Sequence, residues 1–536
     1  MNVAVIGSGM AGAAAAHALT ERGVTVTILD VGEGLDTQRS SVIQELQSMP
    51  NPNWTSGSLE ILGENKTFRG HELPKKLHFG SDYIYAGDRS FSNMLILDKG
   101  RAPLPTFARG GFSNIWGAAA LPIDSCDMQD WPISHGEIQL YLKKVAHLLP
   151  LTGGEGNLEK SFPIFRDNIG HIDIGAQGLQ LLSDLRKAED ALSRSGTLFG
   201  KSRLAIHTDS MDSKKSGVFP CNGCGQCFTG CVRNSIFSTL PILDELEQNG
   251  KVIYKKNLFI DKIDEKDDRV LVQSIDTRSG ERIDFCFDAV FIGAGPINTT
   301  RLLMRSKGIY DDTISLKESQ KFVIPLLRLT GAKTAIEEQG ITQASVFFET
   351  KVPKVSDHWV HVQMVPMNRM ILDASNIPGV EYAWVRRLMM PALRHVMMAW
   401  VGLHSDHSSS LDLRLRKQHN KGDVLELSLN YSKEARQVAR SVSKDLFRKG
   451  GLFKTLFCYG LTRYSNPGSG THCGASFPMR KVPKVYTDTD ILGRPFGWKK
   501  IFAVDSSVLP SIPGTTLAFT MMSNAYRIAT LAPIKK

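Results

Sequence analysis

The chain has 536 residues, enough for two or more hydrophobic cores, and its 42% hydrophobic and 22% charged residues exclude extended disorder. The formal net charge of +10 comes from scattered basic pairs such as Lys214-Lys215 and Arg386-Arg387. Because these pairs form no basic run with interleaved aromatic residues, we expect no nucleic-acid partner. The charge supports only a mild attraction to acidic partners or anionic lipid.

The first thirty residues predict a dinucleotide-binding unit of strand, helix and strand. An apolar strand from Val3 leads into a glycine turn and an alanine-rich helix, and a second apolar run ends at Asp30. Free N–H groups and the dipole at the start of the helix would hold a pyrophosphate, and the Asp30 carboxylate would bind a ribose. The candidate cofactor-binding residues are Gly7, Ser8, Gly9, Met10, Ala11, Gly12 and Asp30. The alternative is a glycine-rich turn with a purely structural role.

Further glycine-rich segments follow along the chain. Residues 107–117 contain three glycines and small polar groups, which predicts a loop, and Ser134 is a suitable N-cap for a helix. Residues 251–304 predict short strands that end in a buried strand, a glycine turn at Gly293-Ala294-Gly295 and the start of a helix. This second turn repeats the pattern of the opening unit.

The later part of the chain predicts a different kind of sheet. Alternating apolar and polar residues between 320 and 430 favour antiparallel strands. Within this region, residues 382–400 are apolar, basic and rich in methionine, and we interpret them as a core helix or, less readily, as an interfacial helix facing lipid or a partner. The last seventy residues predict a strand at 501–505, a Pro/Gly loop and a closing helix from about Phe519.

Four of the eight cysteines lie in residues 221–231, with the C-x2-C-x2-C-x3-C spacing of ferredoxins. Short glycine-containing turns between them would let several thiolates converge on one cluster. The candidate ligands are Cys221, Cys224, Cys227 and Cys231. An iron–sulfur cluster, either 3Fe-4S or 4Fe-4S, is the first interpretation, and structural zinc or unligated thiols are the alternatives.

Such clustering is unlike a disulfide framework spread through a large protein, so we expect a reducing compartment, the cytoplasm. We also expect no signal peptide ahead of the first strand. The longest apolar stretch, residues 388–403, is interrupted by Arg394 and His395 and is too short to span a bilayer. Association with a membrane, or export together with a partner, would be compatible with these features.

These motifs together resemble the glucose–methanol–choline oxidoreductase family. The segments that carry the resemblance are the opening fingerprint, residues 110–117, residues 293–295, Thr471–Met479 and Val504–Gly514. They run in the family's order from end to end, with the middle third covered loosely. The resemblance implies bound FAD and an α/β fold, in which an α+β substrate domain on an antiparallel sheet is inserted into a Rossmann-like FAD-binding domain.

The resemblance also implies how the chain is divided. The FAD-binding domain would comprise residues 1–130, 235–310 and 465–536. The substrate domain would comprise residues 131–234 and 311–464 and would include the cysteine-rich loop. Families of this kind oxidise alcohols by moving a hydride to the flavin, and some related sugar dehydrogenases carry an iron–sulfur cluster between the flavin and an outside acceptor.

Two residues are the catalytic candidates. His472 matches the family's histidine-glycine segment, and a neutral imidazole with an ordinary pKa of about 6.5 suits a general base. The family usually has a second His or Asn at the position of Thr516. A threonine hydroxyl can orient a substrate oxygen but cannot act as a base near neutral pH. Thr516 therefore marks either a positioning role or an altered site.

The resemblance assigns further residues to the cofactor. Asp505 and Ser506 would contact the ribityl–phosphate region, the backbone of Ile260 would meet the adenine, and the second glycine turn would contribute Ala294 and Gly295. Backbone N–H groups near the pyrophosphate and flavin would come from Gly110, Gly111, Ser113, Asn114 and Gly117. No histidine or cysteine lies in that loop, so we expect the FAD to be held non-covalently.

The first functional hypothesis is an FAD-dependent dehydrogenase that acts on the CH–OH group of a sugar, polyol or other alcohol. A cluster in the cysteine loop would let electrons leave singly to a quinone, a cytochrome or a partner protein. The alternatives are an oxygen-reducing oxidase and a flavin-binding protein in which Thr516 marks lost catalysis. A peripheral contact with a membrane is a further hypothesis.

Overall fold

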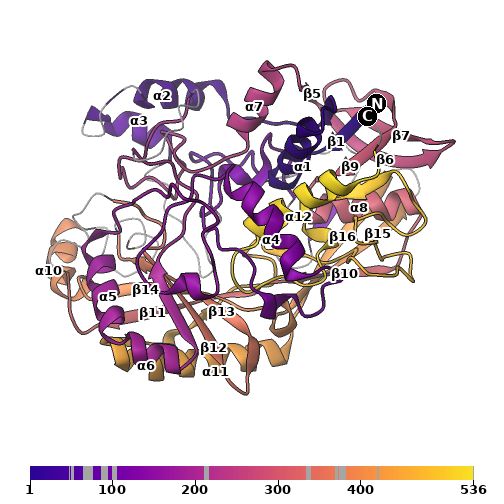
Figure 1. Ribbon diagram of the computed structural model, residues 1–536. Coiled ribbons are helices and arrows are strands. Elements are labelled where there is room, and N and C mark those ends of the chain that lie inside the picture. Colours follow the sequence, from indigo (N-terminus) through magenta and orange to yellow (C-terminus); the bar gives the residue numbers. More distant parts are fainter. Residues whose placement is uncertain are drawn as a thin grey trace.

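The computed structural model describes residues 1–47, 49, 53–63, 76–85, 95–98, 105–209, 217–332, 340–368, 372, 379, 382–418 and 422–534. A parallel sheet with its helices lies in one part of the molecule, and a large antiparallel sheet lies in the other (Figure 1). No helix among the described residues is long and apolar enough to cross a membrane.

The parallel sheet brings together strands from both ends and the middle of the chain. Its order is β20 (Ile501–Ala503), β9 (Ala289–Ile292), β1 (Val3–Ile6), β2 (Val26–Leu29) and β5 (Val252–Lys255). All neighbouring pairs are parallel. Every residue of β1, β2 and β9 is buried, as expected for strands covered on both faces.

Helices α1 (Met10–Glu21) and α12 (Ala518–Leu531) pack side by side against this sheet (Figure 1). The small alanine side chains of α1 are buried and allow this close packing. A Cβ on Gly12 would lie 2.0 Å from the carbonyl oxygen of Gly7, so only glycine lets α1 lie this near the turn.

Other elements complete this part of the molecule. An antiparallel sheet contains β6 (Leu258–Lys266), β7 (Arg269–Asp276) and β8 (Arg282–Phe287). The surrounding helices are α2 (Thr37–Gln47), α3 (Ser56–Ile61), α4 (His135–Ala146), α7 (Leu240–Gln248) and α8 (Pro296–Lys307). Ser134 caps α4 as predicted, because its side chain accepts a hydrogen bond from Glu137 N at 3.1 Å.

The predicted antiparallel region forms a larger sheet. Its order is β17 (Thr455–Phe457), β11 (Lys321–Arg328), β14 (Val396–Gly402), β13 (Ser356–Pro366), β12 (Val346–Val352) and β4 (Thr197–Lys201), with β18 (Arg463–Tyr464) also paired to β11. Helices α5 (Gly175–Lys187), α6 (Glu189–Arg194) and α11 (Lys433–Gly450) share a hydrophobic core with one face of it.

A further sheet links the two parts. It contains β19 (Cys473–Gly474), β10 (Thr313–Glu318), β15 (Ser410–Gln418), β16 (Gly422–Asn430) and β3 (Leu95–Asp98). The expected α/β class, with parallel and antiparallel sheets in one chain, is confirmed. The domain boundaries stay a prediction.

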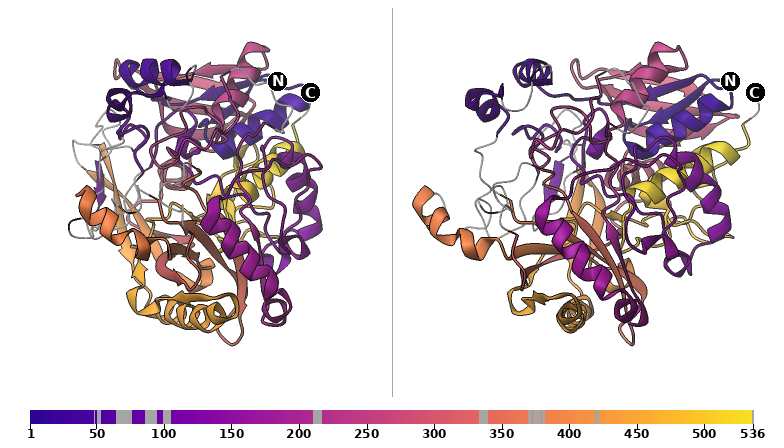
Figure 2. Two further views of the ribbon diagram at one scale, coloured as in Figure 1. Left: turned by 90° about the vertical axis from the view of Figure 1, so that its left-hand side faces the viewer. Right: turned by 60° about the vertical axis from the view of Figure 1, so that its left-hand side comes forward.

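The interpretation of residues 382–400 as one core helix is wrong. The segment divides into α10 (Ala383–Leu393) and the start of β14. Leu393 is buried, but Trp384 and Leu388 are 68% and 75% exposed. In Figure 2, α10 projects from the body of the molecule.

Candidate functional site

A cavity of about 190 Å³ lies at the ends of the parallel strands, where the two glycine turns meet the C-terminal loops. Most of the predicted cofactor residues line it. They are Gly7, Ser8, Gly9, Met10, Ala11, Asp30, Gly111, Ser113, Ile260, Ala294, Gly295, Asp505 and Ser506. His472 also lines the cavity, whereas Gly12, Gly110, Asn114, Gly117 and Thr516 do not. The sequence-predicted residues are thus largely brought together.

Asp30 lies in the wall of this cavity and is buried. Its carboxylate accepts hydrogen bonds from Ser8 Oγ and from the hydroxyl of Tyr254, the latter at 3.1 Å. Burial raises the pKa of Asp30 to about 6, and both hydrogen bonds oppose that rise. Tyr254 is a partner that the sequence analysis missed, because it lies on β5, more than two hundred residues away.

The loop after residue 105 is held against the first glycine turn by its own polar groups. Gly110 N donates to Ser8 Oγ at 2.8 Å, and Gly110 itself has φ +81°, a left-handed conformation that suits glycine. The amide of Asn114 donates to the carbonyls of Arg109 and Gly111, at 2.9 and 3.1 Å. Asn114 therefore shapes the loop, while Gly111 and Ser113 reach the cavity.

Asp505 joins the second glycine turn to the C-terminal strand. Its carboxylate accepts hydrogen bonds from Gly295 N at 2.9 Å, from Ser507 N at 2.9 Å and from Thr299 Oγ1. Asp505 therefore caps the short helix Ser506–Val508 and also lies in the cavity wall. The neighbouring Ser506 Oγ donates to Cys473 O at 2.7 Å and so ties this loop to the segment that carries His472.

Arg301 is another residue that the sequence analysis missed. It lies on α8, lines the cavity, and its guanidinium lies 4.5 Å from the centre of the Phe259 ring. It donates to Ile260 O, so the predicted adenine-contacting segment is held by a buried cation. Burial lowers the pKa of Arg301 to about 10, and Asp261 partly offsets that effect.

His472 faces the cavity in a form suited to accept a proton. Its Nδ1 is buried and has no hydrogen-bond partner among the described residues. Burial lowers the pKa of His472 well below its ordinary value, and the charges of Lys321 and His361 lower it further. The imidazole is therefore neutral at neutral pH. Its backbone carbonyl accepts from Ser319 N at 2.9 Å, which fixes the loop.

The hydroxyl of Thr516 does not reach the cavity. Thr516 Oγ1 donates to Leu121 O at 2.9 Å and accepts from Leu121 N at 2.7 Å. Its one donor hydrogen and one of its two acceptor lone pairs are therefore used by the backbone of a loop from elsewhere in the chain. The geometry makes Thr516 a clamp between two segments and does not support the predicted role of orienting a substrate.

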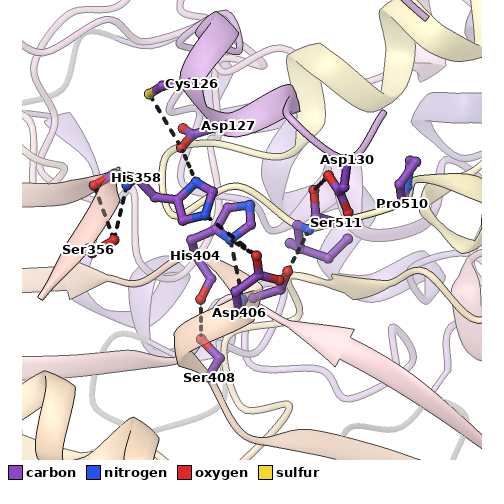
Figure 3. Close-up of polar contacts among 12 residues, drawn as sticks. Cys126, Asp127, Asp130, Ser356, His358, His404, Asp406, Ser408, Pro510 and Ser511 are labelled. Carbon is purple, nitrogen blue, oxygen red and sulfur yellow. Dashed lines mark hydrogen bonds and ion pairs between the residues drawn. The ribbon is translucent and has the colours of Figure 1, made fainter. Parts of the chain in front are cut away.

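A network of histidines and carboxylates lies near Pro510 and Ser511 of the C-terminal loop (Figure 3). His358 Nδ1 lies 3.1 Å from Asp127 Oδ1, and Asp406 Oδ2 lies 3.5 Å from both His358 Nε2 and His404 Nδ1. The loop is attached directly, because Ser405 N donates to Ile512 O at 2.9 Å. The members of this network are separated by up to 279 residues, so no local motif in the sequence indicates them.

The network has donor atoms close enough for a metal ion but the wrong ring geometry. Atoms of Asp127, His358 and His404 lie within 4.8 Å of one another. The two imidazoles, however, stack with ring centres 3.6 Å apart and an angle of 9° between planes. A metal lies in the plane of each imidazole that binds it, and two parallel stacked planes share no such point. We therefore interpret the cluster as a charged hydrogen-bond network.

The four cysteines of residues 221–231 line one small cavity of about 10 Å³. Cys231 Sγ accepts hydrogen bonds from Ser235 N at 3.1 Å and Ile236 N at 3.4 Å, and Lys76 lies near enough to interact with Cys227 and Cys231. Within the described ranges, no three of these sulfurs form a group within 4.8 Å of one another. This spacing disfavours the zinc interpretation, because four thiolates about 2.3 Å from one ion would lie closer together.

Comparisons with known proteins support the fold. Residues 5–38 match the family described as NAD(P)-binding Rossmann-like domain. A search of curated sequences gives no match. Pyridoxine 4-oxidase from Mesorbium loti is 13% identical, with a TM-score of 0.58 over 98% of each chain. Two variants of Aspergillus oryzae RIB40 formate oxidase, studied for an effect on FAD modification, are 14% identical, with TM-scores of 0.58 over 98% of this chain and 97% of theirs. The chain therefore shares the fold of these structures along nearly its whole length.

Proposed function

We propose that the protein is an FAD-dependent oxidoreductase that oxidises a CH–OH group, with His472 as the general base. The observation that carries this proposal is the neutral imidazole of His472 in the wall of a cavity built on a dinucleotide-binding turn. The fold shared with pyridoxine 4-oxidase and formate oxidase supports the same class of chemistry.

The residues around the cavity fit FAD. The N-terminus of α1 and Gly9, whose Cβ position is open, would receive the pyrophosphate, and Asp30 would bind the ribose of the adenosine. Ile260 and the buried Arg301 would border the adenine, and Ser506 would lie toward the ribityl chain. When bound, FAD supplies the hydride acceptor, so that an alcohol losing a hydride and a proton becomes a carbonyl compound.

The chain's own part in the reaction is to position the alcohol and take up its proton. A neutral imidazole can accept the hydroxyl proton, and its low pKa keeps it unprotonated at neutral pH. The price of this low pKa is a weaker base, so the negative charge that develops on the substrate oxygen requires a separate stabilising group. We propose a sugar, a polyol or another alcohol as the substrate that enters the cavity.

A dehydrogenase is the first form of this proposal, because the cysteine loop would offer a route for electrons to a quinone, cytochrome or partner protein. An oxygen-reducing oxidase is the second form, and it is favoured by the names of the structural neighbours, both of which are oxidases. The third form is a flavin-binding protein without turnover. It is favoured by the hydroxyl of Thr516, which is hydrogen-bonded to Leu121 O.

Anaerobic stopped-flow mixing of the flavin-loaded protein with a panel of alcohols and sugars separates these forms. Bleaching of the flavin followed by slow reoxidation in air supports a dehydrogenase, and rapid reoxidation with hydrogen peroxide supports an oxidase. Absence of bleaching with every alcohol contradicts the proposed reaction and favours the form without turnover.

The cysteine loop is proposed to hold an iron–sulfur cluster, 3Fe-4S or 4Fe-4S, with three or four of Cys221, Cys224, Cys227 and Cys231 as ligands. The ferredoxin-like spacing and the N–H groups directed at Cys231 support this assignment. A cavity of about 10 Å³ holds about one water molecule, so the loop must open to admit a cluster. Iron and labile-sulfide analysis of anaerobically purified protein tests it, and the absence of both contradicts it.

A further inference from the structure

Lys321 lies between the two loops of the candidate site and does not itself line the FAD cavity. Its Nζ donates to Ser319 Oγ at 3.1 Å and lies 3.5 Å from Gly514 O, two residues before Thr516. Its Cγ lies 2.9 Å from the position of a Cβ on Gly470, two residues before His472. Since Ser319 N also donates to His472 O, one short segment of chain joins Lys321 to the proposed base.

The register of the antiparallel sheet places Lys321 in a row of polar residues. Lys321 and His361 each pair with Gly402, and His361 pairs with Glu349 on the next strand. This row lies on the face turned away from α5, α6 and α11, because the alternate residues Phe322 and Val362 pack in the core with those helices. The row is therefore directed toward the loops that carry His472 and Thr516.

Gly402 makes room for the ammonium in this row. A Cβ at Gly402 would lie 2.5 Å from Lys321 Nζ and 2.4 Å from Gly514 O. Any larger residue on β14 at this position would separate the sheet from the loop. Because Gly402 has no side chain, the ammonium of Lys321 extends over β14 and approaches the carbonyl oxygen of Gly514.

The ammonium of Lys321 carries a charge that the protein does not pair directly. Among the described residues, no carboxylate forms an ion pair with it, and its nearest polar contacts are a hydroxyl and a carbonyl. Glu349 Oε1 lies 2.5 Å from His361 Nδ1, and Glu318 Oε2 accepts a hydrogen bond from Gly468 N. The other oxygen of each carboxylate is buried without a hydrogen-bond partner among the described residues, Lys321 included. Burial lowers the pKa of Lys321 to about 8, an effect that Glu349 and Glu318 partly oppose.

We propose that Lys321 donates a hydrogen bond to the substrate oxygen that His472 deprotonates, in the position where Thr516 was expected to act. The inference rests on the proposed function. The hydroxyl proton passes to the imidazole of His472, and the negative charge left on the oxygen faces the ammonium. A fixed cation in a buried site stabilises such developing charge far more than water does. Small carboxylates such as acetate, which present the same charged oxygen, would bind to the same ammonium.

The test compares the flavin-loaded wild type with Lys321→Met, Lys321→Arg and the control Lys187→Met. Lys187 lies on α5, is 69% exposed and does not line the cavity, so its replacement removes one charge and a 4.0 Å ion pair with Asp184 without altering the cavity wall. In Lys321→Met we expect acetate affinity, measured by calorimetry, to fall at least about tenfold and the limiting rate of flavin reduction about 100-fold. Lys321→Arg retains part of both, and Lys187→Met retains the wild-type values.

The pH profile separates direct participation from a structural effect. Removal of the ammonium raises the pKa of His472, so the acidic limb of the rate profile, where His472 becomes protonated, shifts to higher pH in Lys321→Met. Wild-type acetate affinity, rate and pH profile in Lys321→Met would overturn the inference. Lys321→Gln replaces Lys321→Met if circular dichroism shows that the latter is unfolded. A wild type that no alcohol reduces contradicts the proposed function, while loss of acetate binding in the variants still identifies Lys321 as an anion-binding residue.

Discussion

His472 is the residue on which the proposed proton transfer depends. It was predictable from sequence because it lies in a local segment, residues 471–479, with a recognisable order. The structure adds that the imidazole is kept neutral by burial and by the neighbouring charges of Lys321 and His361. The combination of a base from one loop and a cation from a sheet could not be predicted from spacing alone.

Replacement of His472 by Ala should slow flavin reduction by an alcohol by about two to four orders of magnitude, because the general base is lost. Anaerobic stopped-flow absorbance measures that rate. His395, which lies away from the cavity lining and bonds to Arg328 O, provides the matched control His395→Ala, for which we expect reduction at the wild-type rate. A His472→Ala protein that is reduced as fast as the wild type would remove His472 from the mechanism.

Residues that meet through strand register were hidden from sequence analysis. Lys321, His361 and Glu349 belong to three strands, and only the pairing of those strands brings them into one row. Thr516 shows how a distant contact bears on a residue of a local motif. The motif left a positioning role and an altered site open, and the structure adds that the hydroxyl is hydrogen-bonded to Leu121, 395 residues away.

At the scale of elements, the opening unit was the most predictable part of the fold. Its glycine turn is recognisable from consecutive residues. The expected strand, helix and strand appear as β1, α1 and β2. Residues 382–400 were less predictable, because a short apolar segment with basic residues fits several structures. The alternating burial of β14 follows a period of two, whereas α10 before it is largely exposed.

Two glycines of the opening turn should respond differently to replacement by alanine. In Gly12→Ala the new Cβ would meet Gly7 O at 2.0 Å, so α1 must move from the turn, and we expect stability to fall by roughly 1–3 kcal/mol. In Gly9→Ala the new Cβ meets nothing within 4 Å, so stability should be retained while affinity for FAD falls. Urea unfolding and FAD titration measure the two effects. Equal stability of the two variants would contradict this account of the turn.

At the scale of the whole molecule, the histidine–carboxylate network joins η4 (Ser125–Met128), β13 and η6 (Ser405–His407) to the C-terminal loop. Burial lowers the pKa of His358, but its hydrogen bonds to Asp127 and Asp406 raise that pKa by more than burial lowers it. The resulting pKa is about 9. The same contact with His358 lowers the pKa of Asp406 to about 2. The network is thus charged across the neutral range and holds distant segments together.

The contribution of His358 to stability should therefore depend on pH. Its folded-state pKa of about 9 exceeds the unfolded value of about 6.5, so the stabilisation is complete below pH 6.5 and is lost as the pH rises through 9. Urea unfolding of the wild type and of His358→Gln should differ by roughly 1–3 kcal/mol at pH 6 and less at pH 9.5. Other titrating groups, including Glu318 and Lys321, change the free energy of unfolding of both proteins alike, so their effect cancels when the two proteins are compared at each pH. A difference that stays constant from pH 6 to 9.5 would show that His358 does not carry this charge.

The central claim is that the cavity at the ends of the parallel strands holds FAD. Its most direct test is the visible absorbance spectrum of the protein after incubation with excess FAD and removal of free cofactor. The account predicts a flavin spectrum with about one FAD per chain, released in acid because no covalent bond holds it, and a marked loss of FAD in Gly9→Ala. A colourless protein that takes up no FAD would contradict the claim.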